Sequence, residues 1–169
     1  MSTRGPLTMR TIALLVPALL LAACASPYNG FNVQPGTPRD AVIARMGQPT
    51  AAVPLPNGGQ RLQYSLQPFG QYAWMVDLDG AGRVVQARQV LTAADFNRIQ
   101  PGWTRADVER EFGPPALIDG VASWSGPIMT YRWRDPVGSD MFYFVYLDQQ
   151  GIVRRAHPGM EFRNASDRE

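Results

Sequence analysis

The chain has 169 residues, a formal net charge of +2 and a pI near 9.0. Its basic residues are all arginine, and the first ten residues hold Arg4 and Arg10 but no acid. Cleavage of an N-terminal segment would remove these two charges and bring the net charge from +2 to zero, so the basic pI does not argue for nucleic-acid binding.

Residues 1–23 have the layout of a secretory signal peptide. An apolar run at 11–21 follows the two arginines and spans about 11 residues, whereas a helix that crosses a bilayer needs roughly 20. The run ends in LAAC, residues 21–24, which resembles the lipobox of bacterial lipoproteins. That resemblance implies cleavage before Cys24 and attachment of diacylglycerol to its sulfur. A simple signal peptide followed by a chance cysteine is the alternative.

Lipidation of Cys24 would leave no free thiol, because Cys24 is the only cysteine of the chain. The resemblance also implies acylation of the new N-terminus, and three chains that each gain about 0.8 kcal/mol per buried methylene form an effectively permanent anchor. Ala25 and Ser26 follow in place of aspartate, which favours the periplasmic face of the outer membrane over the inner membrane. Residues 24–32 are expected to form a flexible linker, with a reach of at most roughly 30 Å.

An internal duplication organises the remaining chain. Residues 33–49 align with 99–115 at a constant offset of 66, and the offset grows to 69 later in each half. Identical pairs are Gln34/Gln100, Pro35/Pro101, Gly36/Gly102, Arg39/Arg105, Val42/Val108, Gly47/Gly113 and Pro49/Pro115, then Leu78/Leu147, Asp79/Asp148, Gly82/Gly151, Val84/Val153 and Ala87/Ala156. The pattern predicts two repeats, at 33–91 and 92–163, followed by a polar tail at 164–169 that is expected to be disordered.

Each repeat is predicted to open with a helix of about ten residues. Thr37 and Thr104 are the candidate N-caps, and Pro38 suits a first helical position. Gly47 and Gly113 stand where a helix ends in a left-handed residue. Strands are predicted at 61–67, 72–78 and 84–91, and at 128–134, 141–147 and 152–157, with Asp-x-x-Gly turns at 79–82 and 148–151. A second short helix is predicted at 93–99, capped by Thr92.

The repeated pattern of helix cap, V-x-x-x-Φ-G-x-P, tyrosine-bearing strand and D-x-x-G hairpin resembles the SmpA/OmlA (BamE-like) family of outer-membrane lipoproteins. The resemblance implies an α+β fold of two tandem repeats, each with short helices packed on one face of a small antiparallel sheet and the opposite face free to bind protein. Family members in the assembly machinery typically carry one copy, whereas two copies in tandem are similar to the β-lactamase inhibitor proteins.

Strand alternation predicts where a partner would bind. Trp74, Val76 and Leu78, matched by Tyr143, Val145 and Leu147, are expected in the core. On the other face the first repeat carries Ala73, Met75 and Asp77, whereas the second carries an aromatic row of Phe142, Phe144 and Tyr146. The candidate binding residues are Phe142, Phe144 and Tyr146 with Tyr131 and Trp133. Alternation alone leaves open whether Tyr131 and Trp133 or Arg132 and Arg134 join the row, and whether the row instead packs as core against the other repeat or a loop.

No constellation in the sequence predicts an enzyme, a metal site or a cofactor. His157 is the only histidine and has no thiol to serve. Asp107, Glu109 and Glu111 alternate along the second helix and are expected on a solvated surface. Ser123 and Ser125 lie in a loop without the turn of a serine nucleophile.

Two functions remain open from the sequence. The first is a non-catalytic envelope lipoprotein that scaffolds a protein partner, which the resemblance suggests is an outer-membrane assembly component. The second is an inhibitor or ligand-binding module whose two sheets form one concave surface.

Overall fold

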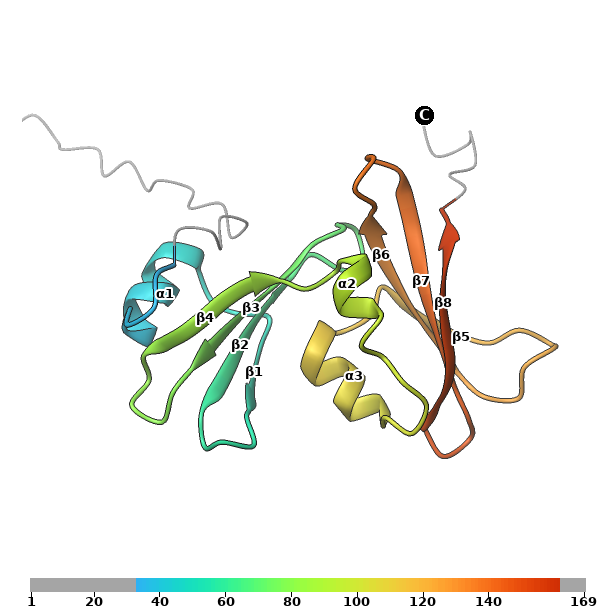
Figure 1. The fold of residues 1–169 in the computed structure, drawn as a ribbon, viewed down its shortest axis with the longest axis horizontal. Helices are drawn as coiled ribbons and strands as arrows, with labels where there is room; N and C mark the ends of the chain where they lie inside the picture. The colour runs from blue at the N-terminus through green and yellow to red at the C-terminus, as the bar shows by residue number, and fades with distance from the viewer. Residues whose placement is uncertain (1–32, 162–169) are drawn as a thin grey trace, which may run out of the picture.

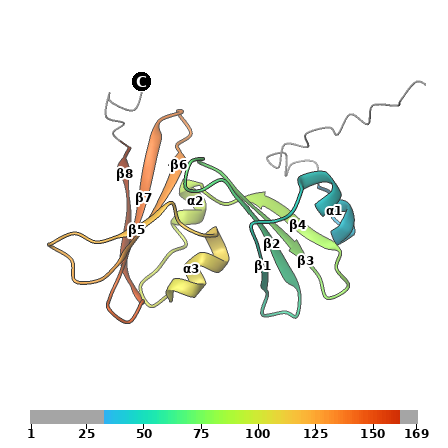
Figure 2. The same ribbon diagram turned by 180° about the vertical axis from the view of Figure 1, so that it is seen from behind.

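The computed structural model describes residues 33–161. The predictions for the signal peptide, for Cys24, for the linker and for the polar tail lie outside these residues. Figure 1 shows two sheets with short helices between and beside them, and Figure 2 shows the same arrangement from behind.

The two halves of the described chain share the order of one helix followed by four strands, and the second half has an additional short helix before it. The first half consists of α1 (Arg39–Met46), β1 (Ala51–Pro54), β2 (Gln60–Ser65), β3 (Ala73–Leu78) and β4 (Val84–Gln89). The second half consists of α2 (Ala93–Phe96), α3 (Arg105–Phe112), β5 (Leu117–Asp119), β6 (Ile128–Arg134), β7 (Asp140–Leu147) and β8 (Val153–Met160). Each half forms a four-stranded antiparallel sheet, in the orders β1-β2-β3-β4 and β5-β6-β7-β8. The chain is therefore α+β, with two antiparallel sheets and few short helices.

The β3–β4 and β7–β8 hairpins close with the predicted Asp-x-x-Gly turns. Asp79 and Asp148 each accept a hydrogen bond at Oδ1 from the backbone N–H four residues later, at 2.9 Å in both turns. Gly82 and Gly151 hold the last turn position at φ of 74° and 77°, which glycine adopts without strain.

The first helix is capped differently from the second, and both are shorter than predicted, with eight residues each. Thr104 caps α3 and forms a reciprocal capping box with Asp107. Thr37 does not cap α1, because Pro38 is the N-cap residue and has no side-chain oxygen. The hydroxyl of Thr37 instead donates to the backbone oxygen of Gln34 at 2.7 Å. The alignment at offset 66 already pairs Pro38, not Thr37, with Thr104.

Replacement of Thr104 by alanine is expected to lower the free energy of unfolding by about 1 kcal/mol, because it leaves the backbone N–H of Asp107 in α3 without its acceptor. Thr37→Ala is the matched control and should change stability by less than about 0.5 kcal/mol, since that hydroxyl caps no helix. Urea unfolding of both variants checks the difference, and equal losses would show that the two threonines have equivalent roles.

Two apolar clusters form the core, and the second extends from one half into the other. The first cluster contains Val42 and Met46 of α1 with Leu62, Trp74, Val76 and Leu78 of the first sheet. The second contains Phe96, Val108 and Phe112 of α2 and α3 with strand residues of the second sheet, and it also includes Ala73 and Met75 of β3. The prediction that Trp74, Val76, Leu78, Tyr143, Val145 and Leu147 are core is confirmed, since each is at most 6% exposed.

Burial along the two central strands differs as a result. All six residues of β3 are buried, whereas β7 alternates between buried and half-buried residues from Phe142 onward. One face of β3 contacts the cluster of α1 and the other contacts the cluster of α2 and α3. In the second sheet, one face contacts the cluster of α2 and α3. Its other face has no such cluster against it and is open to solvent.

Candidate functional site

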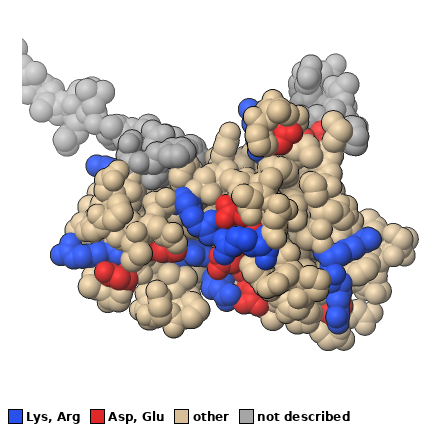
Figure 3. All heavy atoms as spheres, viewed as in Figure 1, with Lys and Arg blue, Asp and Glu red and all other residues tan. Residues whose placement is uncertain are grey.

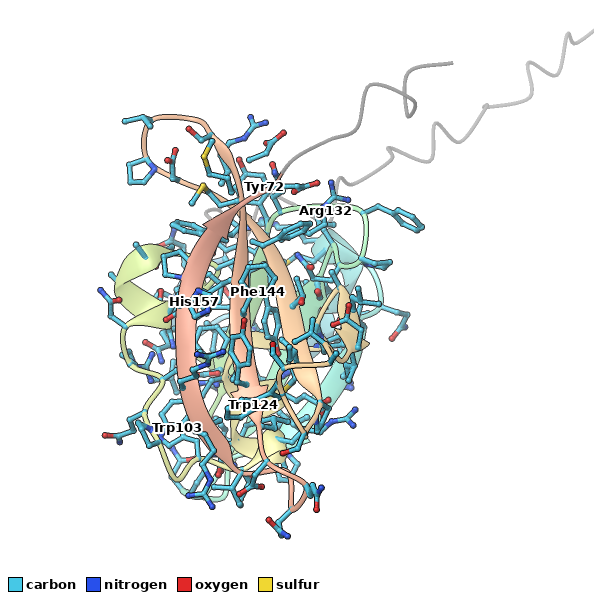
Figure 4. All side chains as sticks on the ribbon, turned by 90° about the vertical axis from the view of Figure 1, so that its right-hand side faces the viewer. Tyr72, Trp103, Trp124, Arg132, Phe144 and His157 are labelled. Atoms are coloured by element: carbon cyan, nitrogen blue, oxygen red, sulfur yellow. The ribbon has the colours of Figure 1, made fainter. Side chains whose placement is uncertain are left out.

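The open face of the second sheet is defined by its cross-strand register. Phe142 pairs with Arg132 of β6 and Gly159 of β8. One step along β7, Phe144 pairs with Thr130 and His157. Tyr146 follows, between Ile128 and Arg155. Figure 4 views this face directly and shows Phe144 at its centre, with His157 beside it and Trp124 and Arg132 toward opposite ends. We call this surface the open face.

The aromatic row of β7 is half-buried because its rings rest on the sheet and on one another. The rings of Phe142 and Phe144 have centroids 5.8 Å apart. The ring of Phe144 also lies across Gly159, where an added Cβ would meet a ring carbon at 2.7 Å. Glycine at position 159 therefore lets this ring lie flat against β8. The outer surfaces of these three large aromatic rings remain in contact with solvent.

Trp124 and Arg155 build the polar end of the open face around Tyr146. Trp124 comes from the loop between β5 and β6, and its indole nitrogen donates to the backbone oxygen of Leu147 at 2.7 Å. The Trp124 ring meets that of Tyr146 edge-on, with centroids 5.4 Å apart. The guanidinium of Arg155 lies over both rings, 4.0 Å from the centroid of Tyr146 and 5.2 Å from that of Trp124. The two rings attract this cation through their faces, and the Arg155 side chain remains exposed to solvent.

His157 completes the row on β8. Its ring stacks on Tyr146 at 5.2 Å and lies 5.6 Å from Phe144. Its Nδ1 lies 3.1 Å from the backbone oxygen of Pro158. His157 is exposed and therefore extends the row of rings from β7 onto β8.

Tyr131 and Trp133, predicted as part of the binding surface, lie on the other face of the second sheet. They are 0% and 4% exposed and belong to the core cluster of α2 and α3. The register explains this placement, because Tyr131 pairs with the core residue Tyr143 whereas Arg132 pairs with Phe142. The hydroxyl of Tyr131 donates to the backbone oxygen of Gly113 at 2.9 Å, and burial raises its pKa well above the ordinary value. Tyr131 and Trp133 therefore belong to the core, and Arg132 lies on the open face.

The corresponding face of the first sheet is filled by α3 and carries a buried ion pair that sequence reasoning missed. Arg61 and Asp77 are 4% and 6% exposed. The guanidinium of Arg61 donates twice to the Asp77 carboxylate, at 2.6 and 2.9 Å, and reaches Glu111 of α3 at 3.1 Å. Glu111 is thus in a contact between the two halves, which corrects the expectation of a solvated surface there. Charged residues inside the alternating strands 61–67 and 72–78 were the available signal.

Backbone contacts strengthen the same junction. The side-chain amide of Gln63, itself buried, donates to the backbone oxygens of Glu109 and Arg110 at 2.8 and 3.1 Å. These are carbonyls in the last turn of α3, where a helix leaves its C=O groups without partners. The first sheet therefore caps the helix of the second half, and its own second face is closed.

Metal-ligand clusters and membrane-crossing helices are absent from the described residues. Within residues 33–161, histidine, cysteine and acidic side chains nowhere gather in groups of three that could hold a metal ion. In the same range, every helix is too short or too polar to cross a bilayer. Ser123 and Ser125 are exposed in the loop that carries Trp124.

Comparison with known proteins adds little to this picture. No family model and no curated protein matches the chain. Among solved structures, the chain is similar to an extracellular protein containing a SCP domain from Bacillus anthracis str. Ames, with a TM-score of 0.29 and 12% sequence identity. The match covers 75% of this chain and 43% of that chain, so the chain spans less than half the length of that protein. A likeness this weak carries no argument about function.

Proposed function

We propose that this chain is a non-catalytic bacterial envelope lipoprotein, anchored through Cys24, that binds a protein partner through the open face of its second sheet. The lipobox-like LAAC sequence supports the anchor, and the resemblance to the SmpA/OmlA family supports an outer-membrane location and a partner in outer-membrane assembly. We also propose the family's layered arrangement, in which short helices cover one face of each sheet.

The contrast between the two sheets carries the proposal. At equivalent positions, β3 has Ala73, Met75 and Asp77, which are buried against the second half, whereas β7 has three aromatic side chains that face solvent. Aromatic residues with an adjacent arginine are the side chains that contribute most to protein interfaces. Each of these half-buried rings keeps part of its apolar surface in water, and burial of that surface by a partner would be favourable.

A partner would have to bind through side chains more than through the backbone of the sheet edge. The outermost strand, β8, contains Pro158, which cannot donate a hydrogen bond to an added strand. The opposite edge, β5, is only three residues long. The row itself is therefore the recognition element.

The inhibitor alternative requires a concave surface made by both sheets. Such a surface would include the face of the first sheet that carries Ala73, Met75 and Asp77. That face is already covered by contacts with the second half. No contact within residues 33–161 favours this second function.

The substitutions Phe142→Ser and Phe144→Ser, made together in the full chain, are expected to abolish capture of the partner from cells. Both side chains are half-buried and their loss opens no sealed core, so the protein should stay folded. Pull-down after crosslinking in cells measures capture, and circular dichroism with urea unfolding checks the fold.

Val85→Ser is the matched control, because Val85 is 55% exposed on β4 of the other sheet. It should leave capture unchanged. Undiminished capture by the double variant, with the fold intact, would refute the open face as the binding site. Capture of a barrel-assembly component would support the outer-membrane role, whereas capture of a soluble periplasmic enzyme would support the inhibitor.

A further inference from the structure

Exposed apolar side chains gather at one end of the protein, next to the Arg132 end of the open face. The large hydrophobic residues with the highest exposure are Val137 at 87% and Phe69 at 86%. Met160 at 61% and Tyr72 at 41% lie near them. Single exposed hydrophobic residues are common on proteins, but clusters of them usually mark a surface that is covered in use.

Hydrogen bonds join the segments that carry these residues into one end surface. Phe69 and Tyr72 belong to the connection between β2 and β3, and Val137 is at the tip of the β6–β7 hairpin. Gln71 of the first segment donates to Asp140 of the second at 2.7 Å. Arg132 at the base of the hairpin donates to the backbone oxygens of Pro68 and Phe69 at 3.3 and 3.5 Å. Both segments lie at the top of Figures 1 and 2, and Figure 4 shows Tyr72 and Arg132 at that same end. We call this surface the apolar tip.

The backbone N–H groups of the hairpin tip are paired within the tip. Val137 and Ser139 donate their N–H groups to Oδ1 of Asp135 at 3.0 and 2.8 Å, and Gly138 donates to the backbone oxygen of Asp135 at 3.0 Å. Pro136 has no N–H to satisfy. In an apolar medium each unpaired backbone donor would carry a large free-energy cost, so pairing the donors internally lowers the cost of moving the tip out of water.

Arginine and acidic side chains also lie beside the apolar tip, as Figure 3 shows at the top of the molecule, and the Asp135 carboxylate of the tip accepts hydrogen bonds from the hairpin backbone. Arg134 reaches Asp140 at 3.0 Å, and Arg132 forms an ion pair with Glu161. The turns at the other ends of the central strands differ, because they carry Asp79 and Asp148 and no large exposed hydrophobic residue. Exposed hydrophobic residues occur elsewhere as well, such as Val85 at 55% and Leu117 at 51%, but none is as exposed as Phe69 and Val137.

We propose that the apolar tip inserts into the surface of the membrane that holds the lipid anchor, with the side chains of Phe69 and Val137 among the headgroups and upper acyl chains. This inference rests on the proposed lipoprotein function. A lipid surface is favoured because the linker of 24–32 keeps the protein within roughly 30 Å of the bilayer. Tyrosine and phenylalanine side chains on turns suit the membrane interface.

Insertion at the tip would orient the open face. The strands β6, β7 and β8 run away from the tip end in Figure 1, so a protein standing on this end turns the faces of its second sheet sideways. Phe144 and its neighbours would then point along the membrane plane, toward a partner held in or on the same bilayer.

The test uses the full, processed chain with a single added cysteine. Lipidation occupies Cys24, the only native cysteine, so Phe69→Cys or Val137→Cys supplies the one thiol that accepts an environment-sensitive fluorophore. The labelled protein is reconstituted into vesicles of phosphatidylethanolamine and phosphatidylglycerol. Emission from both sites is expected to shift to shorter wavelength and to be quenched by nitroxide-labelled lipid. Val85→Cys, at the opposite end of its sheet, is the matched control and should show neither effect.

The outcomes separate this inference from the proposed function. An acylated protein whose labels at 69 and 137 respond like the label at 85, or remain open to a water-soluble quencher, overturns insertion of the tip. Labels that shift only when a protein partner is added overturn it in favour of a protein contact. A purified chain whose mass shows no acyl groups refutes the lipoprotein proposal itself.

Discussion

Replacement of Asp77 by alanine should lower the free energy of unfolding by about 3 kcal/mol, the lower end of the range for breaking a buried ion pair. Arg61 would keep its contact with Glu111 at 3.1 Å but lose both hydrogen bonds to Asp77. Because Arg61 is only 4% exposed, water cannot replace them without opening the junction between the first sheet and α3.

Urea unfolding measures this loss, and the loss on removal of a surface carboxylate is the comparison. Asp40→Ala removes a side chain that is 97% exposed and 3.9 Å from Arg39, so it should cost about 0.5 kcal/mol or less. Equal effects of the two substitutions would show that the face of the first sheet is not closed by α3 in solution.

The same ion pair gives the stability a dependence on acid pH. Burial alone would raise the pKa of Asp77, but hydrogen bonds from Arg61 and Gln86 together with the nearby charge lower it below its ordinary value of 3.8. A carboxylate whose pKa is lower in the folded protein stabilises it at pH above the unfolded value. The difference in stability between the natural chain and Asp77→Ala should therefore be constant above about pH 4 to 5 and shrink as the pH falls further.

Replacement of Phe96 by alanine should cost about 3 to 5 kcal/mol, because it opens a cavity at the centre of the second core. Phe96 is fully buried and stacks on Tyr143 at 4.1 Å and on Phe112 at 5.1 Å. It also meets Trp133 edge-on at 5.6 Å. It is the one buried side chain of α2, so its loss should also detach this four-residue helix.

Phe69→Ala is the matched control for Phe96→Ala. The side chain of Phe69 is 86% exposed, so its removal should change the free energy of unfolding in solution by less than about 0.5 kcal/mol. Thermal or urea unfolding of both variants measures the contrast. A small loss for Phe96→Ala would mean that α2 is not part of the second core.

The sequence predicted the aromatic row correctly as a group but not its neighbours. A period of two assigns Phe142, Phe144 and Tyr146 to one face of their strand. It does not fix which residues of the next strand share that face, because this depends on the register between strands. Tyr131 and Trp133 were therefore grouped with the row although they lie in the core. Arg155 and Trp124 were missed for the same reason, since only the folded chain brings them over Tyr146.

The fold shows a similar division between local and distant information. Helix ends, hairpin turns and central strands follow from glycine, proline and alternation, and they were predicted to within a few residues. The edge strands β1 and β5 were missed because they are short, with four and three residues, and are held by a partner strand more than by their own pattern. The contact of Glu111 with Arg61 joins the two halves, and the periodicity of one helix contains no information about it.

Site-specific photocrosslinking in living cells tests the central claim most directly. A photoreactive amino acid at position 144 of the full chain should form a covalent adduct with the partner, and one at position 75, on the equivalent but buried face of the first sheet, should form none. Adducts from position 144 that disappear when Arg155 is replaced by alanine would identify the open face as the binding surface. The absence of any adduct from positions 142, 144 and 146, in a chain that still captures its partner, would contradict it.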